Sequence, residues 1–152
     1  MLKEGITAPA FKTTDAEGRS VSLKDFRGQK VVLYFYPKDN TPGCTKEACS
    51  FRDAFEDFEK ADIKVLGIST DNEASHKKFV KKFDLPFTLL TDTDHSIADK
   101  YGTYGEKKFM GRTYLGVYRK TFLIDEKGKI KRIFEKVKVD EHAREVLEAF
   151  NS

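Results

Sequence analysis

The stretch at residues 37–49 constrains this chain more than any other, because it joins an apolar strand to a helix that carries both cysteines. The run at 31–36 before it is continuously apolar, which is typical of a strand buried on both faces. Thr41 followed by Pro42 is a helix-start signal, with a hydroxyl residue at the N-cap and proline at the first helical position. We therefore expect the chain to enter a helix just before Cys44.

In that arrangement Cys44 lies in the first helical turn, where backbone N–H groups lack partners and the helix dipole is positive. A thiol in such a position loses its proton more readily and becomes a better nucleophile. Positions 44, 48, 51, 55 and 58 form one apolar stripe with helical spacing. Cys44 is therefore expected to point into the protein, whereas Cys49 shares a polar face with Arg52 and points toward solvent.

The spacing of the two cysteines sets a geometric condition on any bond between them. Residues five apart in an ideal helix have Cα atoms ~8.5 Å apart, and a disulfide needs less than about 7 Å. Cys44 and Cys49 therefore cannot bond while this turn is helical, and we expect the helix start to unwind when the pair is oxidised. The alternative is that the two cysteines are unrelated.

Length and composition exclude several classes of protein. A chain of 152 residues with thirteen Phe and six Tyr suits a single domain over 1–152 with a substantial core. The net charge of +3 is too small to indicate a nucleic-acid partner, and the lysines at 77–82 alternate with apolar residues as on the solvated face of a helix. No apolar run approaches membrane-spanning length, so no membrane partner is expected.

The first residues carry no signal-peptide core, and two cysteines without a secretion signal indicate a reducing compartment, which we expect to be the cytoplasm. The three histidines, His76, His95 and His142, are distant from the cysteines in sequence and are interpreted as surface residues. The chain has no zinc-type cysteine spacing and no glycine-rich phosphate loop. Neither a metal nor an organic cofactor is therefore expected.

Outside this stretch, strands and helices alternate along the chain. Strands are predicted at 30–36, 64–69 and 87–90, and helices at 43–60, 73–83 and 96–101. The remaining predictions are a hairpin of 11–14 with 19–23, a helical turn at 22–27, a loop at 103–114, a strand at 116–125 with its partner at 129–135, and a helix at 140–150 capped by Asp140. This order predicts an α/β thioredoxin-like fold, with a central mixed sheet flanked by helices and an N-terminal β-hairpin.

The pattern Pro37-x-x-x-Thr41-x-x-Cys44 resembles the active-site motif of the peroxiredoxins. The five-residue step to Cys49 is similar to the Q-type, or bacterioferritin-comigratory, branch of that family. The strand sequences at 34–38, 66–71, 87–90 and 122–125 also resemble this branch, and the likeness runs from about Gly5 to the C-terminus.

The resemblance implies that Cys44 is the peroxidatic cysteine, whose thiolate attacks peroxide and becomes a sulfenic acid. Cys49 would be the resolving cysteine, which forms an intramolecular disulfide with it. By the same likeness, the Thr41 hydroxyl and the backbone N–H groups of Gly43 and Cys44 bind the peroxide. The family's arginine corresponds best to Arg119, whose fixed charge would favour the thiolate.

Several of these residues also have simpler interpretations. Thr41 could serve only as the N-cap, and Pro37, which by resemblance shields the thiolate together with Pro42, could only end a strand. Arg119 could be an ordinary strand residue, with Arg52 as a second candidate for the family's arginine. Glu47 could tune the helix start or be a solvated charge.

The function implied is a thiol peroxidase for hydrogen peroxide and organic hydroperoxides, recycled by thioredoxin or a similar dithiol protein. Because both cysteines lie in one helix, no second subunit is needed for the disulfide, and a monomer is expected. A general dithiol oxidoreductase is less favoured, since such proteins usually carry Cys-x-x-Cys. The alternative from another class is a non-catalytic redox sensor or holdase that is switched by the same disulfide.

Overall fold

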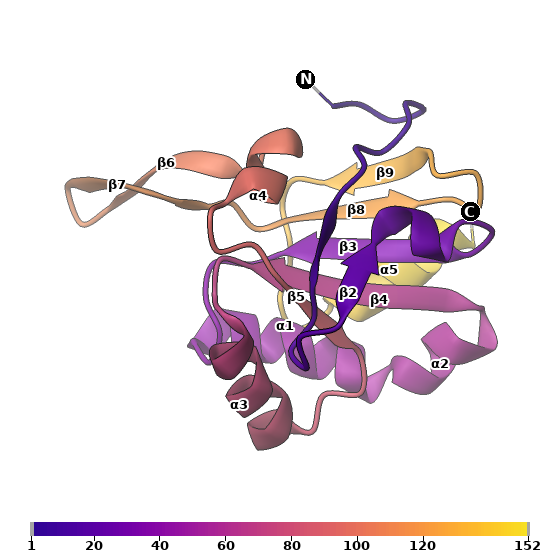
Figure 1. Ribbon diagram of the computed structural model, residues 1–152, viewed down its shortest axis with the longest axis horizontal. Helices are drawn as coiled ribbons and strands as arrows, with labels where there is room; N and C mark the ends of the chain where they lie inside the picture. The colour runs from indigo at the N-terminus through magenta and orange to yellow at the C-terminus, as the bar shows by residue number, and fades with distance from the viewer. Residues whose placement is uncertain (1, 152) are drawn as a thin grey trace.

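The computed structural model describes residues 2–151 and is centred on a five-stranded mixed β-sheet (Figure 1). The strand order is β5-β4-β3-β8-β9, with β3 at Lys30–Phe35, β4 at Ile63–Ser69, β5 at Thr88–Thr91, β8 at Lys120–Ile124 and β9 at Ile130–Phe134. The strands β3, β4 and β5 are parallel, whereas β8 and β9 are antiparallel to their neighbours. The central place of β3 explains its continuous apolar sequence, since both its faces are covered.

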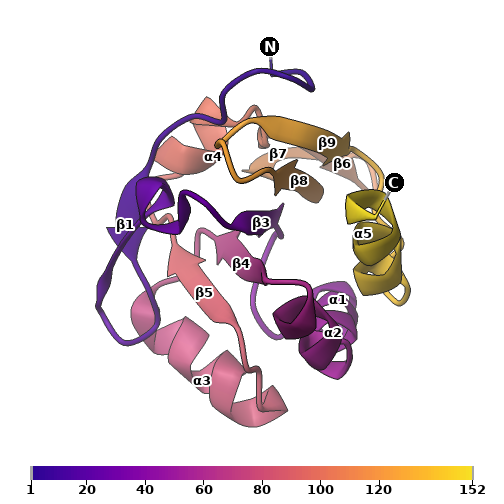
Figure 2. The same cartoon turned by 90° about the vertical axis from the view of Figure 1, so that its right-hand side faces the viewer.

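Helices cover both faces of the sheet (Figure 2). One face carries α1 at Pro42–Asp53, α2 at Phe55–Lys60, α3 at Glu73–Phe83 and α5 at His142–Phe150. The other carries α4 at Ser96–Lys100, the hairpin of β1 at Lys12–Thr14 and β2 at Ser20–Ser22, and the 3₁₀ helix η1 at Leu23–Phe26. Alternate residues of β3 enter the two cores, so the predicted thioredoxin-like class with its N-terminal hairpin is confirmed.

The predicted helix over 43–60 is wrong in one respect, because it divides into α1 and α2. The chain leaves helical geometry at Ala54, whose ψ is 8°. Alanine is the strongest helix former, so nothing local predicts a break there. Packing accounts for it: α2 lies against β4, and this places Phe58 fully inside the core.

The predicted loop over 103–114 is also wrong, because this segment forms most of a β-hairpin, β6 at Tyr104–Phe109 and β7 at Arg112–Val117. Met110 and Gly111 both have positive φ, 52° and 79°, as the two-residue turn of such a hairpin requires. The predicted strand over 116–125 is correspondingly split between β7 and β8. The hairpin projects from the body of the molecule (Figure 1).

An aromatic layer fixes α1 to the sheet. Phe51 of α1 stacks on Tyr34 of β3 with ring centroids 4.8 Å apart, and its edge meets Phe87. Tyr34 in turn lies over Gly67 of β4, where an added Cβ would come within 2.8 Å of the tyrosine ring. The helix that carries both cysteines is therefore held near its C-terminal end, through close packing that leaves no room for a side chain at Gly67.

Replacing Phe51 by alanine is expected to lower the free energy of unfolding by about 3–5 kcal/mol, because it removes a fully buried ring from this layer. Phe109→Ala is the matched control, since that ring is 66% exposed, and its effect should stay within about 0.5 kcal/mol. Urea denaturation of both variants measures the two values. Equal losses would contradict the assignment of Phe51 as the anchor of α1.

Candidate active site

The start of α1 follows directly from the sequence around Thr41. Thr41 has extended backbone angles, φ −99° and ψ 157°, and Pro42 is the first helical residue. The Thr41 hydroxyl donates to the carbonyl of Lys38 at 2.8 Å. Among the described residues, no side chain caps the N–H groups of the first turn of this helix. The predicted N-cap position is confirmed, and the N–H groups of Gly43 and Cys44 stay free of that hydroxyl, as a site for an anionic ligand requires.

Cys44 is almost completely buried, and a guanidinium lies against its sulfur. Arg119 Nη2 is 3.3 Å from Cys44 Sγ. Arg119 immediately precedes β8, and the pairing of Lys120 with Phe35 sets it beside the end of β3, from which the chain leads into α1. An added Cβ at Gly43 would lie 3.2 Å from Arg119 Nη2, so the glycine admits this approach.

Glu47 completes the group, one helical turn after Cys44. Its Oε1 accepts a hydrogen bond from Arg119 Nη1 at 2.7 Å, and its side chain is fully buried. Burial raises the pKa of Glu47 from 4.5 to about 7, although the nearby Arg119 charge acts in the opposite direction. The alternative in which Glu47 is a solvated charge is therefore wrong.

Arg119 remains a cation in this setting. Burial by itself would lower its pKa, but the charges of Glu47 and Cys44, and its hydrogen bonds to both, raise that pKa above the usual value. The site thus presents a fixed positive charge to a sulfur at a helix start. Such a charge stabilises a thiolate and the negative charge that develops when an oxygen leaves.

Cys49 lies in the same helix as Cys44, partly exposed, and both are free thiols. Pro37 is partly buried at the end of β3. Arg52, the second candidate arginine, donates to the carbonyl of Phe83 at 2.9 Å and pairs with Asp53, so it faces the end of α3 and not the Cys44 sulfur.

The interpretation of the histidines as surface residues is wrong for two of the three. His76 and His142 are fully buried, and only His95 is partly exposed. His76 belongs to a polar network with Asp39 and Asp71, whose ligating atoms lie within 4.8 Å of one another. These atoms bond to each other and to neighbouring donors, which is the pattern of a hydrogen-bonded network.

Asp39 was not among the site residues expected from the sequence, and His76 was interpreted as a surface residue. Asp39 stands inside the stretch that includes the active-site motif, between Pro37 and Thr41, and its place there was the available signal. His76 carried no such signal, because a histidine on a helix among lysines resembles a solvated residue.

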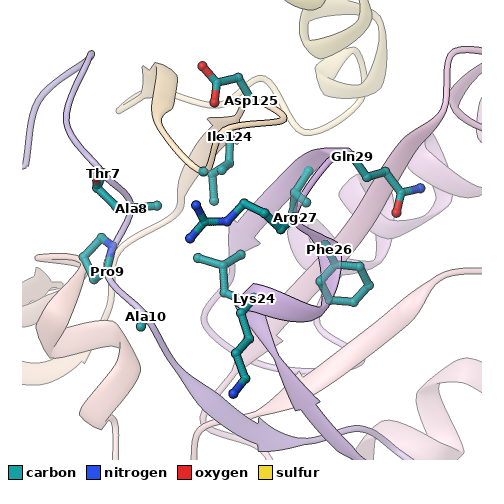
Figure 3. Close-up of a pocket in the computed structure, with 13 residues that line it drawn as sticks. Thr7, Ala8, Pro9, Ala10, Lys24, Phe26, Arg27, Gln29, Ile124 and Asp125 are labelled. Atoms are coloured by element: carbon teal, nitrogen blue, oxygen red, sulfur yellow. The ribbon is translucent and has the colours of Figure 1, made fainter.

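An apolar pocket of about 330 Å³ lies elsewhere, at the start of β3 (Figure 3). Its lining comes from the N-terminal segment around Pro9, from η1 and from the end of β8, with Arg27 and Ile124 among its residues. Cys44 follows the opposite end of β3, so this pocket is separate from the cysteine site.

Among residues 2–151, no helix has the length and apolar character needed to cross a bilayer.

Comparison with known proteins identifies the family of this chain. Residues 5–133 match the AhpC/TSA family. Peroxiredoxin Bcp of Escherichia coli K12 is 49% identical over 96% of this chain and 94% of its own length, and peroxiredoxin Bcp of Bacillus subtilis is 44% identical over 97% and 94%.

A solved structure of peroxiredoxin Q from Xanthomonas campestris superimposes with a TM-score of 0.90 at 35% identity, covering 99% of this chain and 98% of that one. A second structure, of the same organism's bacterioferritin comigratory protein, was determined in a study of its alkyl peroxide reduction activity and also has a TM-score of 0.90. The chain therefore belongs to the AhpC/TSA family, in the branch of the Bcp and peroxiredoxin Q proteins, and is a thiol-dependent peroxidase.

Proposed function

We propose that Cys44 is the nucleophile of this peroxidase and that hydrogen peroxide and organic hydroperoxides are its substrates. The observation that carries the proposal is the contact of Arg119 with the Cys44 sulfur at the start of α1. The related bacterioferritin comigratory protein, studied for alkyl peroxide reduction, supports the substrate class.

In the first step, the Cys44 thiolate attacks one peroxide oxygen and the O–O bond breaks. An S–O bond forms, giving the sulfenic acid, and the electron pair leaves with the other oxygen, which takes a proton and departs as water or an alcohol. The Thr41 hydroxyl and the N–H groups of Gly43 and Cys44 orient the peroxide. Arg119 stabilises the leaving oxygen, and Pro37 limits access of water to the sulfur.

In the second step, the Cys49 sulfur attacks the sulfenic sulfur, an S–S bond forms and water leaves. The first turn of α1 opens for this step, because helical geometry holds the two cysteines too far apart. A dithiol protein of the thioredoxin type then reduces the disulfide by exchange.

We propose further that the whole chain acts as one domain and as a monomer, since α1 holds both cysteines. Its place would be the cytoplasm, where such dithiol reductants are kept reduced. Each cycle removes one molecule of peroxide, and the enzyme would in this way serve antioxidant defence. The alternative, a redox sensor or holdase, would form the same disulfide but would not turn over.

Cys44→Ser is expected to slow steady-state peroxide consumption, coupled to thioredoxin, by at least about a thousandfold, because the nucleophile is gone. Cys49→Ser is the matched control. It should still consume one equivalent of peroxide rapidly, and turnover should then stop because the intramolecular disulfide cannot form. Turnover that survives in Cys44→Ser would contradict the proposal. Formation of the disulfide without turnover in the wild type would favour the redox sensor.

Hydrogen exchange tests the opening of the helix. We expect the amides of residues 44–50 to exchange at least about tenfold faster in the oxidised protein than in the reduced one, since the disulfide is incompatible with this turn. Mass spectrometry of both redox states gives the measurement, and the amides of β3 serve as the internal reference. Equal protection in the two states would show that the disulfide forms without unwinding.

The buried Glu47 predicts a pH dependence of stability. Because its pKa is raised from 4.5 to about 7 in the folded protein, the stability it contributes is complete below pH 4.5 and is lost as the pH rises through 7. The free energy of unfolding of the reduced wild type, relative to Glu47→Gln, should therefore fall by about 3 kcal/mol between pH 4.5 and 7. Urea titrations across this range measure it, and a difference that does not change with pH would refute the burial effect.

A further inference from the structure

The loop between β3 and α1, residues 37–41, is held in place by hydrogen bonds of a buried carboxylate, that of Asp39. Asp39 is only 6% exposed. Its Oδ1 accepts from the Tyr36 hydroxyl at 2.6 Å, and its Oδ2 accepts from the Ser75 hydroxyl at 2.8 Å and lies 2.7 Å from His76 Nδ1. Burial raises the pKa of Tyr36 well above its usual value, so this hydroxyl keeps its proton and donates.

His76 connects the loop to two further elements. It belongs to α3, is fully buried, and its Nε2 lies 2.8 Å from the carbonyl of Leu90 in β5. A carbonyl only accepts, so Nε2 carries a hydrogen. On the other side of the ring, one proton must lie between Nδ1 and the Asp39 carboxylate for a contact of 2.7 Å. The loop is thereby tied through one ring to both α3 and β5.

The backbone of the same residue is held as well. The N–H of Asp39 donates to Asp71 Oδ2 at 2.8 Å, and that oxygen also accepts from the Ser69 hydroxyl at 2.6 Å. The next residue, Asn40, has a left-handed φ of 58°, a conformation that costs energy outside glycine and needs surrounding contacts to persist. Thr41 follows immediately, so the place of its hydroxyl depends on this fastening.

We propose that Asp39 and His76 are positioning residues for the peroxide reaction. They hold the loop before α1 in place, so that the first turn of α1 re-forms each time the disulfide has been reduced, and in this sense they are a fixed point for that turn. The inference rests on the proposed role of Cys44. Asp39 is two residues before Thr41 and five before Cys44. With this fixed point lost, the turn spends more time unwound, so the peroxide step slows while the disulfide step, which needs the unwound turn, accelerates.

The opposite changes in the rates of the peroxide step and the disulfide step distinguish a positioning role of Asp39 from a purely structural one. A variant that only weakens the core changes the population of unfolded protein and leaves both steps unchanged in the folded molecules. Asp92→Asn is the matched control: Asp92 is 5% exposed and accepts from the N–H groups of Ile97 and Ala98, at the start of α4 on the other face of the sheet.

The experiment measures both steps in Asp39→Ala, in Asp92→Asn and in the wild type. Competition with a chromogenic peroxidase gives the rate constant for hydrogen peroxide, and acid quenching with mass spectrometry gives the rate of disulfide formation after one equivalent. Asp39→Ala should lose at least about tenfold in the first and gain at least about threefold in the second, and Asp92→Asn should match the wild type in both. Asp39→Asn should recover most of the loss, because its amide can donate to His76 Nδ1 and accept from Tyr36.

Rates within twofold of the wild type in Asp39→Ala, or a parallel loss in both steps, would overturn the proposal. Should Asp39→Ala not fold, Ser75→Ala removes one of the three bonds to the carboxylate and should shift both rates in the same directions, about twofold each. Unchanged rates in that variant would equally overturn it.

Hydrogen exchange tests the role of Asp39 independently of the proposed role of Cys44. The amides of residues 45–47 in the reduced protein, which are the first bonded amides of α1, should lose protection in Asp39→Ala and keep it in Asp92→Asn, whatever the activity. An inert wild type would refute the role of Cys44 alone. Equal protection in the two variants would refute the role of Asp39 alone.

Discussion

One guanidinium links the Cys44 sulfur to the Glu47 carboxylate, and the proposed chemistry depends on this link. Arg119 contacts the Cys44 sulfur with one nitrogen and the buried Glu47 carboxylate with another. A buried carboxylate without a partner is costly, so the fully buried Glu47 favours a position of the half-buried Arg119 in which the two groups pair. Because Glu47 and Cys44 both belong to α1, these two contacts fix Arg119 relative to the helix that carries the proposed nucleophile.

The fold supplies the conditions for this contact. Strand β8 pairs with β3, so Arg119 at its start comes level with the end of β3, and Gly43 leaves space for the guanidinium. In the proposed cycle, the helix also opens for the disulfide and then closes again. Phe51 anchors it near its C-terminal end and the network around Asp39 precedes it, so opening is confined to the segment between these two points.

The sequence was sufficient for the parts of the fold with strong periodicity or specific spacing. The apolar run of β3, the Thr41-Pro42 helix start and the class of the fold were predicted from it. The break at Ala54 was not, because it arises from packing of α2 against β4. The hairpin of β6 and β7, which turns at Met110 and Gly111, was missed because its glycines resemble loop residues, although only Gly111 serves the turn of positive φ.

The site was predicted only where residues lie in the motif or its likeness. Cys44, Thr41 and Arg119 were identified as candidates, and the structure brings Arg119 to Cys44 across the sheet. Glu47 was left between two interpretations, since only the tertiary structure shows that it is buried against Arg119. His76 was placed on the surface, because its partners Asp39 and Leu90 are distant in sequence and no local pattern indicates them.

Because Arg119 joins Glu47 to the Cys44 sulfur, we propose that Glu47 acts on the peroxide reaction through Arg119, and a double-mutant cycle tests this most directly. The quantity is the rate constant of the reduced protein with hydrogen peroxide, in Glu47→Gln, Arg119→Met and the double variant. Arg119→Met should lose at least about tenfold and Glu47→Gln alone clearly more than about twofold, whereas adding Glu47→Gln to Arg119→Met should cost less than about twofold more. Losses that multiply independently in the double variant would contradict the claim.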